Sequence, residues 1–293
     1  MDARINDWVN RELYPFESKF ISLESGEMHY IDEGDGPVIL FVHGTPTWSF
    51  LYRKIIGELS KKYRCIAIDH MGFGLSDKLL NFEGRPQDHS INLTEFIKKL
   101  GLNKITLVVH DFGGPIGLSA AIRDADKFNR IILFNTWLWA TSGNPEALKV
   151  DRIVNSFVGK LLYLNLNFSP KVLLKRAYYH KKLLTKTVHQ QYIKPFSNKN
   201  SRRSLWNLAK SLVGSSDWYQ HQWEQLDALM QKKWLIVWGT KDEFISTEYL
   251  DKWKDRIPQA MTTELACGHF VQEEMNAEVI RSISTFLRAD HNN

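Results

Sequence analysis

The chain has 293 residues, and 43% of them are hydrophobic, which is enough for one substantial core that carries an inserted subdomain. No apolar stretch reaches about 18 residues, so we expect no membrane span. The first residues lack the basic flank and apolar run of a secretory signal. The two cysteines, Cys65 and Cys267, are too few for a disulfide framework and form no metal-binding cluster. They favour a reducing cytoplasm and predict no metal.

The net charge of +5 is unevenly distributed. Residues 140–233 contain 16 Lys or Arg but 5 Asp or Glu, so the remainder of the chain is net acidic. A basic segment of this kind could attract anionic substrates, lipid headgroups or nucleic acid. A solvated helical surface is the commoner explanation, and no nucleic-acid-binding module accompanies the charge. We therefore expect no nucleic-acid partner.

Apolar runs of strand length alternate along the chain with segments whose apolar residues have helical spacing. The runs cover residues 37–44, 63–72, 104–111, 130–137 and 232–242. Near-continuous apolar strands are typical of a parallel sheet that is covered on both faces. The helical segments cover residues 48–62, 114–128 and 277–288. This alternation predicts a doubly wound α/β sheet.

A long insertion separates two of the predicted strands. About 95 residues lie between Thr136 and Lys232. A single crossover helix needs far fewer residues, and an unstructured loop of this length is uncommon in a compact domain. They contain helical patterns at residues 152–164 and 201–213, together with most of the basic charge. We expect a helical cap at residues 139–228, inserted into a core formed by residues 1–138 and 229–293. It would cover the carboxyl ends of the strands, where open α/β sheets bind ligands.

Asp111 stands where the strand in "LVVHDFGGPIGL" breaks and a helix of small residues begins. Such a strand–turn–helix has the form of a nucleophile elbow, which exposes the side chain at the turn beside a helix N-terminus. The pentapeptide G-x-S-x-G of serine hydrolases is absent from the chain. A carboxylate with a pKa near ~3.9 is ionised at neutral pH and can displace a leaving group from carbon, forming an alkyl ester. The structural alternative is an Asp that caps the helix.

Two further residues stand at strand ends that would meet Asp111. His269 ends "MTTELACGH" (residues 261–269), the last predicted strand segment, and Asp242 ends the run at residues 232–242 before it, which is the nucleophile–acid–histidine order of α/β-hydrolases. His269 would activate water against the ester, and Asp242 would fix the histidine tautomer. Each residue alone could be an ordinary loop residue, but three at matching strand ends favour catalysis. The backbone N–H groups of Thr45 and Phe112 would form an oxyanion hole.

Five segments together resemble the haloalkane dehalogenases of the α/β-hydrolase superfamily: "HGTPTWSFLYR", "DHMGFGLSDK", "VVHDFGGPIGL", "GTKDEF" and "CGHFVQEE". The resemblance covers nearly all of the predicted core. It implies hydrolytic dehalogenation with Asp111 as nucleophile, His269 as base and Asp242 as acid, without a cofactor. The implied partners are a small apolar halogenated substrate, water and the halide product, for a monomer or homodimer. One branch of the family takes its acid from the preceding strand, but Asn135 stands there.

The resemblance fails at the residues expected to hold the halide. The family commonly places Trp after the nucleophile and often Asn in the earlier turn, whereas this chain has Phe112 and Thr45. The Phe112 side chain offers no donor, and losing one donor to a developing anion costs about 3 kcal/mol. Another branch uses a cap tryptophan, for which Trp137, Trp139, Trp206, Trp218 and Trp223 are candidates. Trp137 is nearest to a strand end, although ordinary packing is the favoured explanation for each of them, because buried aromatic residues usually belong to the core.

Other functions share this set of residues. Epoxide hydrolases use the same fold and acid–base set with two cap tyrosines, and the predicted cap contains Tyr163, Tyr178, Tyr179, Tyr192 and Tyr219. An aspartate could also open a strained β-lactone. A non-catalytic ligand receptor is a third possibility, which an intact nucleophile, base and acid disfavour. For the enzymes we expect an apolar pocket lined by Phe112, Trp48 and cap aromatics.

Overall fold

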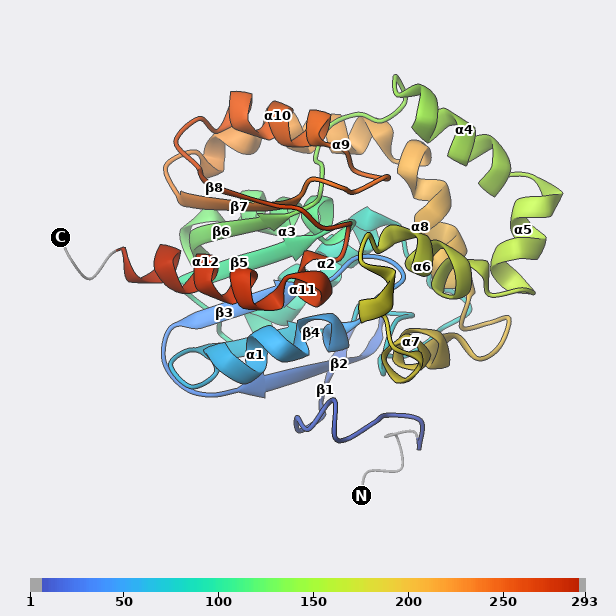
Figure 1. Ribbon diagram of the computed structural model, residues 1–293, viewed down its shortest axis with the longest axis horizontal. Coiled ribbons are helices and arrows are strands. Elements are labelled where there is room, and N and C mark those ends of the chain that lie inside the picture. Colours follow the sequence, from blue (N-terminus) through green and yellow to red (C-terminus); the bar gives the residue numbers. More distant parts are fainter. Residues whose placement is uncertain (1–6, 290–293) are drawn as a thin grey trace.

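The computed structural model describes residues 7–289, which form an eight-stranded sheet with helices on both faces (Figure 1). The strands are β1 (Lys19–Leu23), β2 (Gly26–Glu33), β3 (Val38–Val42), β4 (Arg64–Ile68), β5 (Ile105–His110), β6 (Phe128–Phe134), β7 (Lys233–Gly239) and β8 (Met261–Leu265). Their order across the sheet is β1-β2-β4-β3-β5-β6-β7-β8. β3 to β8 are parallel, whereas β2 is antiparallel to both of its neighbours.

The five apolar runs identified in the sequence form the parallel strands β3 to β7, so the prediction of these strands is confirmed. β5 is buried at all of its positions, as expected for a strand covered on both faces. The hairpin of β1 and β2 was not among the predicted strands. β1 is largely half-exposed at the edge of the sheet, and both strands mix charged with apolar residues, so neither gives a continuous apolar run.

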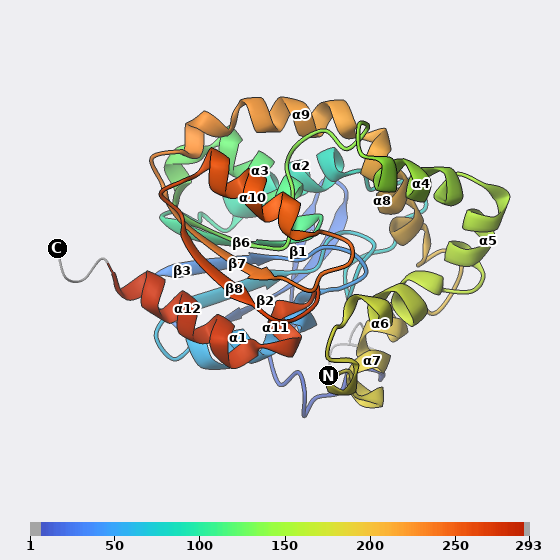
Figure 2. The same ribbon diagram turned by 45° about the horizontal axis from the view of Figure 1, so that its top comes forward.

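Two layers of helices cover the sheet. α1 (Arg53–Leu59), α11 (Val271–Glu274) and α12 (Asn276–Arg288) lie on one face, and α2 (Pro86–Lys99), α3 (Gly113–Arg123) and α10 (Thr247–Arg256) lie on the other (Figures 1 and 2). The 3-10 helices η1 (Ser49–Tyr52), η2 (Ala125–Lys127) and η6 (Leu226–Leu229) complete the core. Within residues 7–289, no helix is long and apolar enough to cross a membrane.

The segment between β6 and β7 is helical, and most of it forms a cap beyond one end of the sheet, whereas its last α-helix returns over α3 (Figure 2). It contains α4 (Pro145–Val154), α5 (Phe157–Leu164), α6 (Leu174–Ala177), α7 (Lys186–Ile193), α8 (Arg203–Gly214) and α9 (Ser216–Glu224), with the π-helix η3 (Ser169–Leu173) and the 3-10 helices η4 (Lys181–Leu183) and η5 (Lys194–Phe196). An α/β sheet with an inserted helical cap was expected from the sequence. The boundaries at residues 139 and 228 stay a prediction.

Candidate active site

Asp111 occupies a strained turn between β5 and α3. Its φ of 53° lies in the left-handed region, which a non-glycine residue adopts at a cost. The turn brings neighbouring backbone very close: a Cβ on Gly113 would lie 2.3 Å from the carbonyl oxygen of Val42, and a Cβ on Gly44 would lie 2.2 Å from Asp111 Oδ1. Glycine is therefore required at both positions. The strained turn lifts the carboxylate away from the sheet, as expected for a nucleophile elbow.

The three residues predicted to form a triad lie together at the carboxyl ends of β5, β7 and β8. His269 Nδ1 lies 2.7 Å from Asp242 Oδ2, and His269 Nε2 faces Asp111 Oδ2 at 3.7 Å. The exposed fraction of the side chain rises from 0% at Asp242 to 5% at His269 and 12% at Asp111. The carboxylate of Asp111 is thus the most accessible member of the group, and Asp242 is sealed behind the histidine.

Asn135 supports this arrangement in a way that the sequence analysis missed. Its Nδ2 donates to Asp242 Oδ2 over 2.9 Å, while its Oδ1 accepts the N–H of Gly239 over 2.8 Å. The other oxygen of Asp242 accepts the backbone N–H groups of Phe244 and Ile245. In the sequence, Asn135 stands only where one branch of the resembled family carries its acid. Its place after β6, next to β7, was the signal that it would reach Asp242.

The loop that carries His269 is tied to the cap. The His269 N–H donates to the carbonyl of Ala177 over 2.9 Å. The Glu274 side chain, which has no exposed surface, accepts the N–H of Gly268 over 3.0 Å and that of His180 over 2.7 Å. Glu274, which was also missed, therefore holds the histidine loop and the cap turn through a single carboxylate.

Burial and neighbouring charges set the protonation of the site. Burial raises the pKa of Asp111 to about 6, while the charge of His269 and the backbone N–H groups of Phe112 and Thr45 oppose the rise. The Thr45 N–H lies 2.8 Å from Asp111 Oδ1. Burial lowers the pKa of His269, but the adjoining Asp242 carboxylate outweighs it, so the pKa stands above its usual 6.5. Asp111 is ionised at neutral pH, although by a narrower margin than the sequence suggested.

One tryptophan of the five candidates lies at the nucleophile turn. The ring of Trp137 packs edge-on against Phe112, with centroids 4.9 Å apart, and against Tyr219 at 5.8 Å. Its Nε1 is buried and has no hydrogen-bond partner within residues 7–289, and the same holds for Thr45 Oγ1. A buried N–H without a partner is costly and calls for an explanation.

The other four tryptophans are engaged elsewhere. Trp206 Nε1 donates to the carbonyl of Val154 over 3.0 Å. Trp139 and Trp223 pack against each other and against the core, and Trp218 packs against Tyr219. Packing is therefore the simpler account of these residues.

Two of the five candidate tyrosines are near enough to Asp111 for its charge to raise their pKa values. Burial and then Asp111 raise the pKa of Tyr163 to about 12, and the same causes raise that of Tyr219. The Tyr219 hydroxyl, however, donates to the carbonyl of Ser211 over 2.8 Å. Tyr163 has no hydrogen-bond partner among the described residues. Only one of these two phenols is therefore free to serve a ligand.

The remaining three tyrosines have different surroundings. Tyr192 donates to Glu273 over 2.5 Å, and Tyr179 is exposed. Tyr178 packs on Phe270, and its buried hydroxyl has no hydrogen-bond partner among residues 7–289. The expectation that Trp48 lines the pocket is wrong. Trp48 has no exposed surface, because its ring is enclosed by Trp8, Tyr14 and Phe50 and its Nε1 donates to the carbonyl of Gln191.

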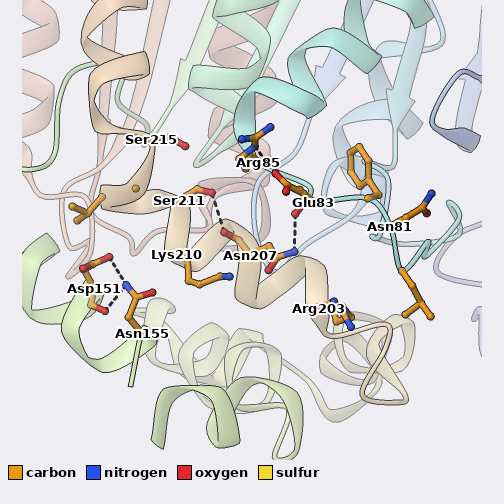
Figure 3. Close-up of a pocket in the computed structure, with 14 residues that line it drawn as sticks. Asn81, Glu83, Arg85, Asp151, Asn155, Arg203, Asn207, Lys210, Ser211 and Ser215 are labelled. Atoms are coloured by element: carbon orange, nitrogen blue, oxygen red, sulfur yellow. Dashed lines mark hydrogen bonds and ion pairs between the residues drawn. The ribbon is translucent and has the colours of Figure 1, made fainter. Parts of the chain in front are cut away.

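A groove of about 620 Å³ lies on the surface where the cap meets the core, away from the triad (Figure 3). Its lining comes from the segment before α2 and from α4 and α8, and includes Glu83, Arg85, Asp151, Asn155, Arg203, Asn207 and Lys210. Asn207 Nδ2 donates across it to the Glu83 carbonyl over 2.7 Å. The polar lining does not suit a small apolar substrate, and none of Asp111, Asp242 and His269 reaches the groove.

Known proteins resemble this chain in both sequence and structure. A family model described as the α/β hydrolase fold matches residues 37–275. "Haloalkane dehalogenase 2" of Mycobacterium tuberculosis is 32% identical over 276 residues, covering 93% of this chain and 95% of the relative. "Cis-3-alkyl-4-alkyloxetan-2-one decarboxylase" of Shewanella oneidensis is 31% identical over 287 residues, covering 94% and 89%.

Solved structures agree with the fold. The haloalkane dehalogenase DbeA from Bradyrhizobium elkani superimposes with a TM-score of 0.84 at 22% identity, covering 94% of this chain and 98% of its own. DatA from Agrobacterium tumefaciens C58, also a haloalkane dehalogenase, gives 0.83 at 23%, covering 93% and 96%. The chain belongs to the α/β-hydrolase superfamily. Within it, the chain falls in the branch that contains the haloalkane dehalogenases.

Proposed function

We propose that the protein is a hydrolytic haloalkane dehalogenase with Asp111 as its nucleophile. A carboxylate oxygen of Asp111 bonds to the halogen-bearing carbon, the carbon–halogen bond breaks, and the halide leaves with the bonding electrons. His269 then takes a proton from water, and the resulting hydroxide attacks the ester carbonyl of Asp111. The tetrahedral intermediate collapses to the alcohol and the free carboxylate. The supporting observation is an accessible carboxylate on a strained turn, 3.7 Å from a histidine that is paired with a buried Asp.

Each residue has one role in this sequence of steps. Asp111 is ionised above a pKa of about 6 and needs no base for the first step. His269 acts only on water, and Asp242 stabilises the imidazolium that forms. The N–H groups of Thr45 and Phe112 are placed to receive negative charge on the carboxyl oxygen of Asp111 during hydrolysis. No step uses a metal or a cofactor.

Trp137 is the proposed halide donor. Its unpaired Nε1 is beside Phe112, where the departing anion needs an N–H group. With no donor on Phe112 and a hydroxyl at Thr45, we expect bromide and iodide to leave more readily than chloride. We assign substrate recognition to the cap at residues 139–228. The two buried free thiols, Cys65 and Cys267, are consistent with a reducing cytoplasm.

Turnover of 1-bromobutane tests the proposal. Bromide and 1-butanol should appear in equal amounts, and a single turnover in ¹⁸O-water should place the label on a carboxyl oxygen of Asp111, because water attacks the ester carbonyl. Asp111→Asn should release no bromide. The matched control is Asp151→Asn, whose carboxylate lies on α4 away from the triad. The absence of bromide, or label in the alcohol alone after the first turnover, would contradict the proposal.

Opening of a β-lactone is the second candidate, and the side chains of Phe112 and Thr45 favour it. Neither offers the indole or amide donor that holds a halide. An oxetan-2-one leaving group is a carboxylate that stays attached to the substrate, so the reaction needs no halide site. Asp111 would bond to the ring carbon and the ring C–O bond would break; loss of CO₂ would then expel Asp111 and form an alkene. Alkene and CO₂ from a dialkyl oxetan-2-one, with no bromide from bromoalkanes, would favour this candidate.

A further inference from the structure

The outer helices of the cap expose apolar side chains that no described residue covers. On α4 these are Val150 and Ile153, with 41% and 55% of their surface exposed. On α5, Phe157 is 82% exposed, Val158 58% and Leu161 42%. These five residues, the apolar face of α4 and α5, lie on two successive helices at the edge of the cap farthest from β1 to β8 (Figures 1 and 2). A cluster of large exposed apolar side chains is typical of an interaction site.

Basic side chains without acidic partners accompany this face. Arg152 on α4, Lys160 on α5, and Lys171 and Lys175 on the following turns are exposed. Among residues 7–289, none of these four forms an ion pair. Residues 140–233 as a whole have a large excess of Lys and Arg. Exposed apolar residues and exposed cations without an acidic partner therefore occur together on α4, α5 and the turns that follow, and their complement is a surface that is apolar inside and anionic outside.

α5 connects this face with the candidate active site. Tyr163 is buried on the inner side of α5, and the charge of Asp111 contributes to its raised pKa. Phe157, Val158 and Leu161 are on the outer side of the same helix. One helix thus has the reaction site on one side and the exposed apolar residues on the other.

We propose that the apolar face of α4 and α5 docks on an anionic lipid bilayer. Burial of Phe157 and Val158 among acyl chains and contact of Arg152 and Lys160 with phosphate groups account for both properties of the face. A second copy of the chain fits less well, because a two-fold interface would bring identical basic side chains together. If the proposed reaction is correct, an apolar substrate dissolved in the bilayer reaches the cap from the membrane.

Vesicle flotation of the full chain tests the docking. We expect the protein to float with vesicles of phosphatidylcholine plus phosphatidylglycerol, and to float weakly with phosphatidylcholine alone or at high salt. Phe157→Ser combined with Val158→Ser should lower the partition coefficient roughly tenfold or more, since both apolar anchors are lost. Arg152→Gln combined with Lys160→Gln should remove the preference for anionic lipid. The matched control, Leu80→Ser with Ile91→Ser, changes two comparably exposed residues of the core and should float like the unaltered chain.

Two readouts keep the outcomes distinct. Circular dichroism melting should be the same in all variants, so that loss of flotation reports docking and not unfolding, whatever reaction the site performs. Unchanged flotation of the Phe157 and Val158 variant, or no flotation of the unaltered chain, overturns the proposal. A dimer in light scattering that dissociates in that variant would also overturn it, since a second copy would then cover the face.

Discussion

Asn135 and His269 contact the same oxygen of Asp242. Asn135 Nδ2 donates to Asp242 Oδ2 over 2.9 Å, and His269 Nδ1 lies 2.7 Å from that atom. The Asn135 amide cannot rotate without breaking its second bond, to the N–H of Gly239. The acid is therefore oriented from the neighbouring strand, and the direction of the His269 ring depends on a residue that never meets the substrate.

Replacing Asn135 by Ala should slow ester hydrolysis more than ester formation. Loss of a hydrogen bond to a buried charged group costs on the order of 1 to 3 kcal/mol, which corresponds to roughly fivefold to 150-fold in rate. Rapid-quench kinetics should show a preserved bromide burst and a slower steady state. Asn129→Ala, which alters an exposed residue of β6, the strand that Asn135 follows, is the control. An equal decrease in the burst rate and in the steady-state rate would show that Asn135 maintains the fold and does not position Asp242.

Replacing Trp137 by Phe should weaken halide release. The ring stays apolar and aromatic, but the unpaired Nε1 is lost. Removal of one preorganised donor should lower the rate of bromide formation about 10² to 10³-fold. Stopped-flow measurement of the burst with a bromoalkane checks this, with Trp218→Phe as control because Trp218 packs on the same tyrosine. An unchanged burst would rule out Trp137 as the halide donor.

The two chemical steps should both fail at acid pH. The bromide burst should fall as the pH drops through about 6, because protonated Asp111 is not a nucleophile. Hydrolysis should fall as the pH drops through the raised pKa of His269, because the protonated ring cannot accept a proton from water. Measuring the burst amplitude and the steady-state rate from pH 5 to 9 separates the titration of Asp111 from that of His269. A burst that strengthens on acidification would contradict the role of Asp111.

Asp111→Asn should stabilise the fold at alkaline pH. The pKa of this carboxyl is about 6 in the folded chain against 3.8 in a free carboxyl, so folding favours the protonated form. Its contribution to stability is complete below the unfolded value and is lost as the pH rises through 6. Removing the buried charge should then increase the free energy of unfolding by up to about 3 kcal/mol at pH 9. Chemical denaturation at pH 9 and pH 4 measures this, and a gain of equal size at both pH values would contradict it.

The sequence pattern predicted the catalytic residues, because each of them stands at the end of a predicted strand. Asp111 and Asp242 each end an apolar run, His269 ends the strand segment "MTTELACGH", and parallel strands bring their carboxyl ends to one edge. The convergence of the three could therefore be predicted before any contact was known. The strained φ of Asp111 could be anticipated too, because small residues follow it.

The supporting residues could not be predicted in the same way. Glu274 and Asn135 act through side-chain hydrogen bonds to His180 and to Asp242, which are far along the chain, and no periodicity encodes such contacts. Trp48 was expected to line the pocket, but its ring packs against Trp8 and Tyr14 and its Nε1 donates to Gln191 instead. Tertiary packing of aromatic rings decides such positions, and the local pattern does not contain it.

The intact mass of His269→Gln after incubation with 1-bromobutane tests the central claim most directly. Without the base, the alkyl ester on Asp111 cannot be hydrolysed and should accumulate. We predict one added butyl group per chain, located on Asp111 by peptide mapping and absent when Asp111→Ala is combined with His269→Gln. No adduct, or an adduct that persists without Asp111, would contradict a dehalogenase that works through this carboxylate.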